Sequence, residues 1–241
     1  MVANYWQDSR APRYSVLVAL PLFLFYQILV AIPARGAQGL RNGADVLLQL
    51  PFLWVAGTRG PLLFTACLLA VGGWLVWRDV MRHRGGWRPV VVALMLGEAA
   101  ALAIVFGVVV STLTVHLVPP AAALGARISD SLSVGTRLML SLGAGLYEEL
   151  LFRVILVGSL AWAGRRFLAL RPLVAGIWAT LIGALIFSAF HYIGPYGDTL
   201  RVYSFVFRTI AGLAFSALYL LRGFGVTAWT HALYDTFLIL R

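Results

Sequence analysis

The sequence is short of charged residues, of lysine and of cysteine. Only 12% of its 241 residues are charged, whereas a soluble domain has about a quarter. All 19 basic residues are arginine, which we interpret as the mark of a GC-rich bacterial genome. The single cysteine, Cys67, lies in an apolar run and cannot form an internal disulfide. These shortages argue against a soluble domain and against a disulfide framework.

Polar stretches long enough to enclose a core of their own are also missing, so we expect one membrane domain over residues 1–241. Hydrophobic residues make up 61% of the chain. Apolar runs of about 18 or more residues recur along it, each long enough to cross a bilayer core. We predict an all-α, polytopic transmembrane helical bundle of about 7–8 spans that encloses a polar cavity. The spans are predicted at about 14–34, 61–77, 90–118, 138–163, 173–191, 200–221 and 226–240.

One further apolar segment, DVLLQLPFLWVAG at 45–57, is too short to cross and contains Pro51. It predicts an interfacial or re-entrant segment.

With the N-terminus inside, ten arginines fall in inner loops and seven on the outer side, which favours this orientation. The formal charge of +10 is spread over short loops. It therefore indicates anionic lipid headgroups, and not nucleic acid, as the partner. The predicted location is the bacterial inner membrane, crossed several times.

Three charged residues interrupt the apolar run GLYEELLFRVILVG at 145–158. A charge at the bilayer centre costs about 2.5–3.5 kcal/mol on insertion scales, so it normally faces the bundle interior and has a function. Glu149 and Arg153 are four residues apart, with the acid first, and can pair on one helix face. Glu148 is turned about 100° away from Glu149 and has no partner on its own helix. Its position suits a general base.

Two later apolar spans contribute polar residues at one-turn spacing. Phe187 and His191 are four apart in IFSAFHYIG, and His231 and Asp235 are four apart in THALYDTF. A purely structural network of this size would be an expensive way to join helices. We therefore predict one catalytic or ligand-binding cluster drawn from three spans.

Two chemistries fit such a cluster. Glu148 with a histidine can deprotonate a water, while the second histidine and a polar side chain stabilise the oxyanion of an attacked carbonyl. Alternatively, the two histidines and a carboxylate can ligate zinc. Spacing alone does not choose between them. The sequence has no HExxH motif, and Ser159 in LVGSL lacks the GxSxG pattern.

At these residues the chain resembles the CAAX prenyl protease and bacteriocin-processing (CPBP) family of intramembrane endopeptidases. Three motifs match in order, each on its own span: Glu148-Glu149-xxx-Arg153, Phe187-xxx-His191 and His231-xxx-Asp235. The resemblance covers residues 138–240, which we take as the CPBP-like catalytic core. The first 137 residues match only as apolar spans.

The resemblance implies that Glu148 and His191 activate water, and that His231 and the residue four later stabilise the oxyanion. That last residue is commonly Asn in the family but is Asp235 here. An ionised Asp would repel an oxyanion, so Asp235 is protonated, or orients His231, or is neutralised by a cation such as Arg208. The family has been described both as glutamate proteases and as metalloproteases. We favour no cofactor, with zinc on Glu148, His191, His231 and Asp235 as the alternative.

The implied partner is a membrane-embedded protein or peptide substrate within the lipid bilayer. The competing hypothesis is a non-enzymatic membrane protein, either a transporter or a bacteriocin-immunity protein that uses the buried charges for binding. A transporter should show paired, broken spans in two related halves, and the sequence shows none. A further buried acid, Glu98, is expected to have a structural role and to pair with Arg208 or Arg153, or to line the substrate path.

Overall fold

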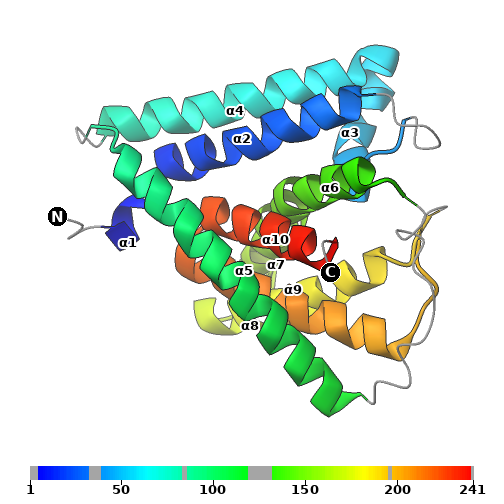
Figure 1. The fold of residues 1–241 in the computed structure, drawn as a ribbon. Helices are drawn as coiled ribbons and strands as arrows, with labels where there is room; N and C mark the ends of the chain where they lie inside the picture. Colours follow the sequence, from blue (N-terminus) through cyan, green and yellow to red (C-terminus); the bar gives the residue numbers. More distant parts are fainter. Residues whose placement is uncertain (1–4, 33–38, 83–85, 119–131, 195–196, 240–241) are drawn as a thin grey trace.

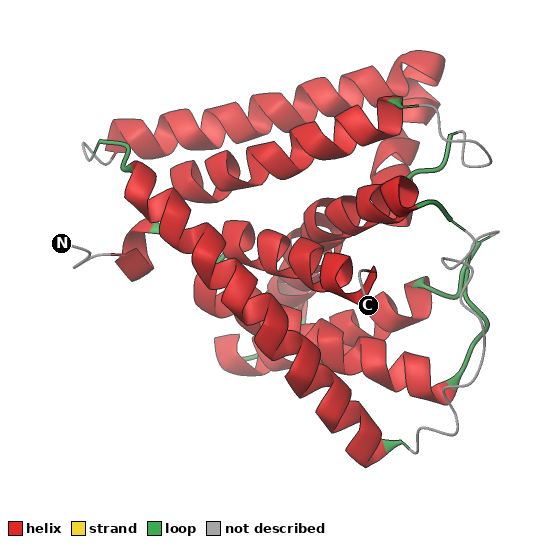
Figure 2. Cartoon of the chain, in the orientation of Figure 1, coloured by secondary structure: helices red, strands yellow, loops and turns green. Residues whose placement is uncertain are grey.

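The structure, a computed structural model, describes residues 5–32, 39–82, 86–118, 132–194 and 197–239 (Figure 1). Every secondary-structure element in these ranges is helical (Figure 2), which confirms the predicted all-α class. The elements, in chain order, are α1 (Tyr5–Asp8), α2 (Pro12–Ala31), α3 (Gly43–Ala56), η1 (Gly57–Arg59), α4 (Gly60–Arg82), α5 (Pro89–Leu117), α6 (Val134–Gly143), η4 (Ala144–Val157), α7 (Gly158–Phe167), α8 (Pro172–Phe190), α9 (Val202–Arg222) and α10 (Phe224–Ile239).

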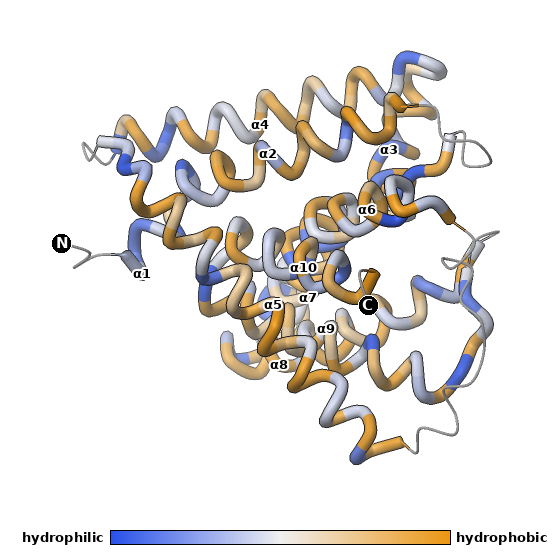
Figure 3. The backbone as a smooth tube through the Cα atoms, in the orientation of Figure 1, coloured by the Kyte–Doolittle hydropathy of each residue, from blue (hydrophilic) through white to orange (hydrophobic). Residues whose placement is uncertain are grey.

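The helices are long and apolar enough for a membrane protein. Five helical stretches among the described residues have the length and hydropathy to cross a membrane. Apolar residues are spread along the whole length of these helices, as the colouring of Figure 3 shows. The predicted spans 138–163 and 226–240 are not among the five. The first falls on three consecutive elements, α6, η4 and α7, and the second on α10, which has 16 residues. The predicted count of about 7–8 spans therefore stays approximate.

Helices α2 and α4 lie side by side and run in opposite directions (Figure 1). The guanidinium Nε of Arg13, at the start of α2, is 3.4 Å from Asp79 Oδ2, near the end of α4. Helix α3 connects them and must therefore begin and end at the same end of the bundle. The predicted segment 45–57 is thus a short helix that does not cross. It therefore does not change the side of the membrane on which each later span begins.

Local sequence signals set the ends of several helices. Proline occupies the first turn of α2, α5 and α8, where its missing N–H has no intrahelical partner to lose. The side chains of Asn42 and Ser133 cap α3 and α6 by accepting backbone N–H groups. Gly223 ends α9 with φ 77°, a conformation open to glycine. It permits a one-residue turn into α10.

Helix α10 occupies the centre of the bundle, where it packs against α2, α5, α6, η4 and α9 (Figure 1). The backbone of α10 comes close to that of η4. A Cβ placed on Gly145 would lie 2.3 Å from the carbonyl oxygen of Ala228 and 2.8 Å from the backbone nitrogen of Ala232. The glycine therefore lets the backbones of η4 and α10 touch. This contact brings the Glu148 motif beside the His231 motif.

The buried acid Glu98 of α5 does not pair as the sequence predicted. Its carboxylate accepts hydrogen bonds from Arg222, at 2.5 and 2.6 Å, and from the hydroxyl of Tyr5. The prediction of Arg208 or Arg153 as its partner was wrong, because α9 presents its C-terminal end, and not its middle, to Glu98. Burial, together with the hydrogen bond to the Glu98 carboxylate, raises the pKa of the Tyr5 phenol above its usual range. The contact ties α1, α5 and α9 together at one end of the bundle.

Candidate active site

The Glu-Glu motif lies on η4, a stretch wound as a π-helix between the α-helical segments α6 and α7. In a π-helix the backbone hydrogen bonds span five residues, and such winding is frequent at functional sites. The sequence predicted an ordinary α-helix here. Glu148, Glu149 and Arg153 are all buried on this element. The winding keeps Glu149 and Arg153 on one face and turns Glu148 to another.

Glu149 forms the predicted pair with Arg153. Its Oε2 is 3.2 Å from Arg153 Nε, and neither side chain has more than 1% of its surface exposed. Its other oxygen, Oε1, is 2.6 Å from His231 Nδ1. The Glu149 carboxylate thus joins two elements, because it contacts a cation on its own helix and an imidazole on α10.

Arg153 is enclosed by aromatic rings. Its guanidinium carbon lies 4.4 Å from the centroid of Phe187 and 5.6 Å from that of Phe215. The negative face of an aromatic ring attracts a cation, and more strongly where water is absent. The phenylalanine of the FxxxH motif therefore supports the buried cation of the first motif.

Glu148 has different partners from its neighbour. Its Oε1 accepts a hydrogen bond of 2.9 Å from Asn42 Nδ2, at the start of α3. Its Oε2 is 3.9 Å from His191 Nε2 and has no hydrogen-bond partner among the described residues. A gap of this size between two polar groups is one that a water molecule can bridge.

His191 directly follows α8, as its C-cap residue. Its Nδ1 is 2.8 Å from the carbonyl oxygen of Phe187. A carbonyl oxygen only accepts, so Nδ1 carries a proton, and in the neutral ring Nε2, the atom facing Glu148, is an acceptor. The packing of α8 and α10 on η4 brings His191, Glu148 and His231 together.

His231 and Asp235 lie one turn apart on α10 and face each other, as predicted. His231 Nε2 is 3.5 Å from Asp235 Oδ2, while the ring stacks on Phe215 with centroids 4.3 Å apart. The side chains of Asp235 and His191 are 29% and 26% exposed, against 8% for Glu148. The cluster is therefore open on the side of His191 and Asp235 and closed behind Glu148.

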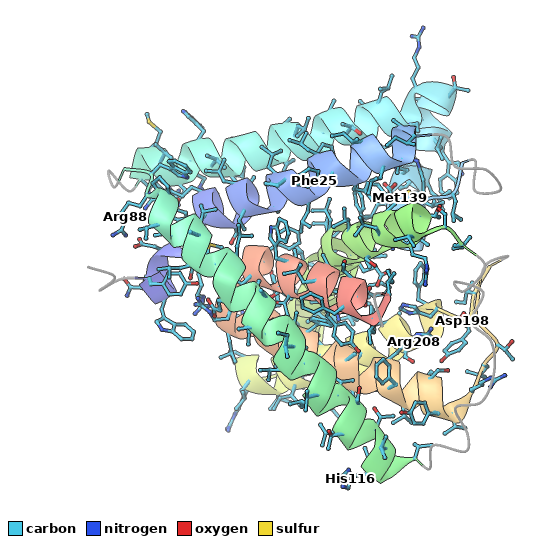
Figure 4. The ribbon with its side chains drawn as sticks, in the orientation of Figure 1. Phe25, Arg88, His116, Met139, Asp198 and Arg208 are labelled. Atoms are coloured by element: carbon cyan, nitrogen blue, oxygen red, sulfur yellow. The ribbon has the colours of Figure 1, made fainter. Side chains whose placement is uncertain are left out.

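Arg208 of α9 was a predicted candidate for neutralising Asp235. It forms an ion pair with Asp198, and its guanidinium lies over the ring of Tyr192 at 5.1 Å. Figure 4 labels Arg208 and Asp198 close together, on the side of the bundle where α10 ends. The backbone N–H of Asp198 also donates to the carbonyl of His191, at 2.9 Å. This pair flanks the open side of the cluster.

The residues that the sequence proposed for zinc do not form a metal-binding set. In the part of the chain that the structure describes, no group of three or more His, Cys, Asp and Glu side chains is arranged to hold a metal ion. We derive no step through a metal.

Asn42 and Phe215 belong to the cluster but were missed in the sequence. Asn42 contacts Glu148, and Phe215 stacks on His231. Asn42 precedes Gly-Ala-Asp, a signal for the start of a helix, but a capping signal does not indicate contact with a distant helix. Phe215 is one of many apolar residues in its span and has no distinguishing signal.

Comparison with known proteins agrees with this geometry. Residues 130–237 match the family model described as Type II CAAX prenyl endopeptidase Rce1-like. The match covers a little under half of the chain and supports membership of the CPBP family. No curated protein and no solved structure gives a significant match. The match supports intramembrane endopeptidase activity in general, and together with the five apolar helices it supports a multi-pass membrane location. The matched region contains the motif residues Glu148, Glu149, Arg153, Phe187, His191, His231 and Asp235. Asn42 lies outside it.

Proposed function

We propose that the protein is a glutamate-type CPBP endopeptidase that hydrolyses a peptide bond of a membrane-embedded protein or peptide. The observation that carries the proposal is the 3.9 Å gap between Glu148 Oε2 and His191 Nε2. Both atoms accept hydrogen bonds, because Glu148 is a carboxylate and the His191 proton is on Nδ1. A water in this gap donates one hydrogen to each and directs a lone pair away from them.

The first step is the attack of this water on the substrate carbonyl carbon. Glu148 takes the proton as the new C–O bond forms, and the carbonyl oxygen becomes an oxyanion. When the C–N bond breaks, the leaving amine takes that proton from Glu148. One water is consumed, and the products are a carboxylic acid and an amine, which exchange the remaining proton to give a carboxylate and an ammonium group.

The oxyanion is stabilised from α10 in this proposal. His231 donates from Nδ1 to the Glu149 carboxylate at 2.6 Å, and we propose that its Nε2, which lies 3.5 Å from Asp235 Oδ2, carries a second proton for the oxyanion. Preorganised donors of this kind commonly contribute the largest share of catalysis of acyl transfer. Because Glu149 already orients the His231 ring, Asp235 is available as a protonated donor to the same oxyanion.

No metal takes part in the proposed reaction. The substrate reaches the site within the bilayer of a bacterial inner membrane. The open side, between His191 and Asp235 and flanked by Arg208, is where its backbone would enter.

Cleavage of a transmembrane peptide by the purified protein in proteoliposomes tests the proposal. The wild-type protein should release two fragments, and Glu148→Gln and His191→Gln should each reduce the rate by a factor of 1,000 or more (~4 kcal/mol of barrier). The matched control is Asp198→Asn, which alters the flank of the site but none of the reacting groups. Binding of peptides without cleavage, unchanged by Glu148→Gln, would instead favour the immunity-type hypothesis.

A further inference from the structure

We infer that Asn42 is a positioning residue for the catalytic carboxylate, so that α3, outside the region matched by the family, completes the active site. The inference rests on the proposed role of Glu148. It concerns a hydrogen bond between two buried side chains, Asn42 Nδ2 and Glu148 Oε1, separated by 2.9 Å.

The amide of Asn42 is fixed by its other end. Its Oδ1 accepts the backbone N–H of Ala44 at 2.9 Å, as the cap of α3. A backbone N–H can only donate, so this contact assigns the oxygen to the helix and the NH2 group to Glu148. The capping bond therefore orients the donor, and one side chain both starts α3 and faces the catalytic acid.

The backbone of Asn42 is held as well. Its N–H donates to the hydroxyl of Tyr26 at 3.2 Å, and that hydroxyl donates to Asp45 Oδ2 at 2.7 Å. Arg41 donates to the same carboxylate oxygen at 2.7 Å. Helix α2 thus anchors the start of α3 through Tyr26, and the amide has little freedom to turn away from Glu148.

A glycine permits this approach. A Cβ on Gly143, the last residue of α6, would lie 2.7 Å from the Cβ of Asn42 and 2.6 Å from Cε2 of Tyr26. Contacts this short do not occur between real side chains, so only glycine at this position lets Asn42 reach η4. Gly143, which directly precedes η4, therefore leaves room for the start of α3.

As a consequence, the two carboxylate oxygens of Glu148 have different roles. Oε1 is occupied by Asn42, and Oε2 remains for the water shared with His191. Without Asn42 the carboxylate can rotate, and a buried oxygen loses its donor. Asn42 does not touch the substrate, so its loss should lower kcat and leave KM unchanged.

Asn42→Ser and Asn42→Asp test this inference, because serine and aspartate also cap helices well. Both should retain α3, yet serine is too short to reach Glu148 and aspartate brings a second carboxylate against it. We expect kcat to fall about 10- to 100-fold in Asn42→Ser, by analogy with the loss of residues that hydrogen-bond to metal ligands in metalloenzymes. The fall should be larger in Asn42→Asp. Ser133→Ala, which removes the cap of α6 alone, is the control and should keep the wild-type kcat.

A second measurement does not depend on activity. Asn42→Ser should lower the melting temperature in the wild-type background but leave it nearly unchanged in a Glu148→Ala background, because interacting residues are non-additive. Wild-type kcat in Asn42→Ser, or additive melting temperatures, would overturn the inference. A wild-type protein that cleaves nothing would contradict the proposed function, and the melting temperatures would still decide whether Asn42 holds Glu148.

Discussion

Glu148 and Glu149 are neighbours in the chain, yet their carboxylates have different partners. Glu149 contacts the Arg153 guanidinium and His231 and is fully buried. Glu148 contacts the neutral amide of Asn42 and faces His191 across a gap. The first arrangement holds the structure together, whereas the second leaves an oxygen free for a reactant.

Substitutions at the three charged positions of η4 should therefore differ in kind. Glu148→Gln should abolish cleavage and leave the yield of folded protein nearly unchanged. Glu149→Gln and Arg153→Ala should also lower the melting temperature, because each leaves a buried charge without its partner, at about 3–5 kcal/mol. Cleavage assays and thermal unfolding in detergent measure both effects. Equal and mild effects at all three positions would contradict this division.

Asp235 is the position at which the sequence departs from the usual residue of the CPBP family. If it donates a hydrogen bond as a neutral acid, Asp235→Asn replaces one donor with another of the same shape. Activity should then survive and persist to higher pH, because an amide has no proton to lose. If Asp235 instead acts through its charge, the rate should fall about 10–100-fold, by analogy with lost outer-shell partners. A well-folded but inactive Asp235→Asn protein would contradict the first interpretation.

The pairs within one helix were predictable from spacing, and most contacts between helices were not. Glu149 with Arg153 and His231 with Asp235 are four residues apart, and both pairs meet in the structure. The partner of Glu98 was predicted wrongly, since it depends on which end of α9 crosses α5. Asn42 was missed for the same reason, because nothing in its local sequence encodes a neighbour on η4.

The Glu148 motif on η4 and the His231 motif on α10 lie side by side because the backbones of these two helices touch. The methyl group of an alanine at 145 would overlap the Ala228 carbonyl and the Cβ of Ala232, at 2.3 and 2.7 Å. Neither atom belongs to a flexible side chain. The distance between Glu148 and His231 therefore depends on this glycine.

Gly145→Ala should push α10 away from η4. We expect a loss of stability of about 1–3 kcal/mol, the usual effect of overpacking, and a fall in activity larger than the loss of folded protein explains. Gly176→Ala in α8 is the matched control, because no atom lies within 4 Å of the added Cβ. A glycine inside a helix is less favourable than alanine by about 0.5–1 kcal/mol, so the control should be neutral or stabilising. A Gly145→Ala protein as active and stable as the control would refute the proposed contact.

At the scale of the whole molecule, the apolar runs predicted most of the helices and their order. The ion pair of Arg13 with Asp79 shows that α3 stays at one end, as the short segment with Pro51 indicated. The central position of α10 and the π winding of η4 were not predictable, because both follow from packing among distant helices. A run of apolar residues is equally compatible with the centre and the rim of a bundle.

The metal content of the intact protein tests the choice between the two chemistries left open by the sequence. We predict substoichiometric zinc by elemental analysis of active protein and unchanged cleavage after treatment with a chelator. The reason is that water activation needs only the two acceptors, Glu148 and His191, in this account. One tightly bound zinc per chain that is required for turnover would reverse it.

The central claim is that Glu148 activates a water and does not itself attack the substrate. Cleavage of a peptide in heavy-oxygen water, with the protein in excess so that each molecule turns over once, tests it most directly. We predict that the new C-terminal carboxylate carries one heavy oxygen and that the peptide containing Glu148 carries none. Heavy oxygen in Glu148, with an unlabelled product, would contradict the account, because it would mean that the carboxylate had formed an acyl intermediate.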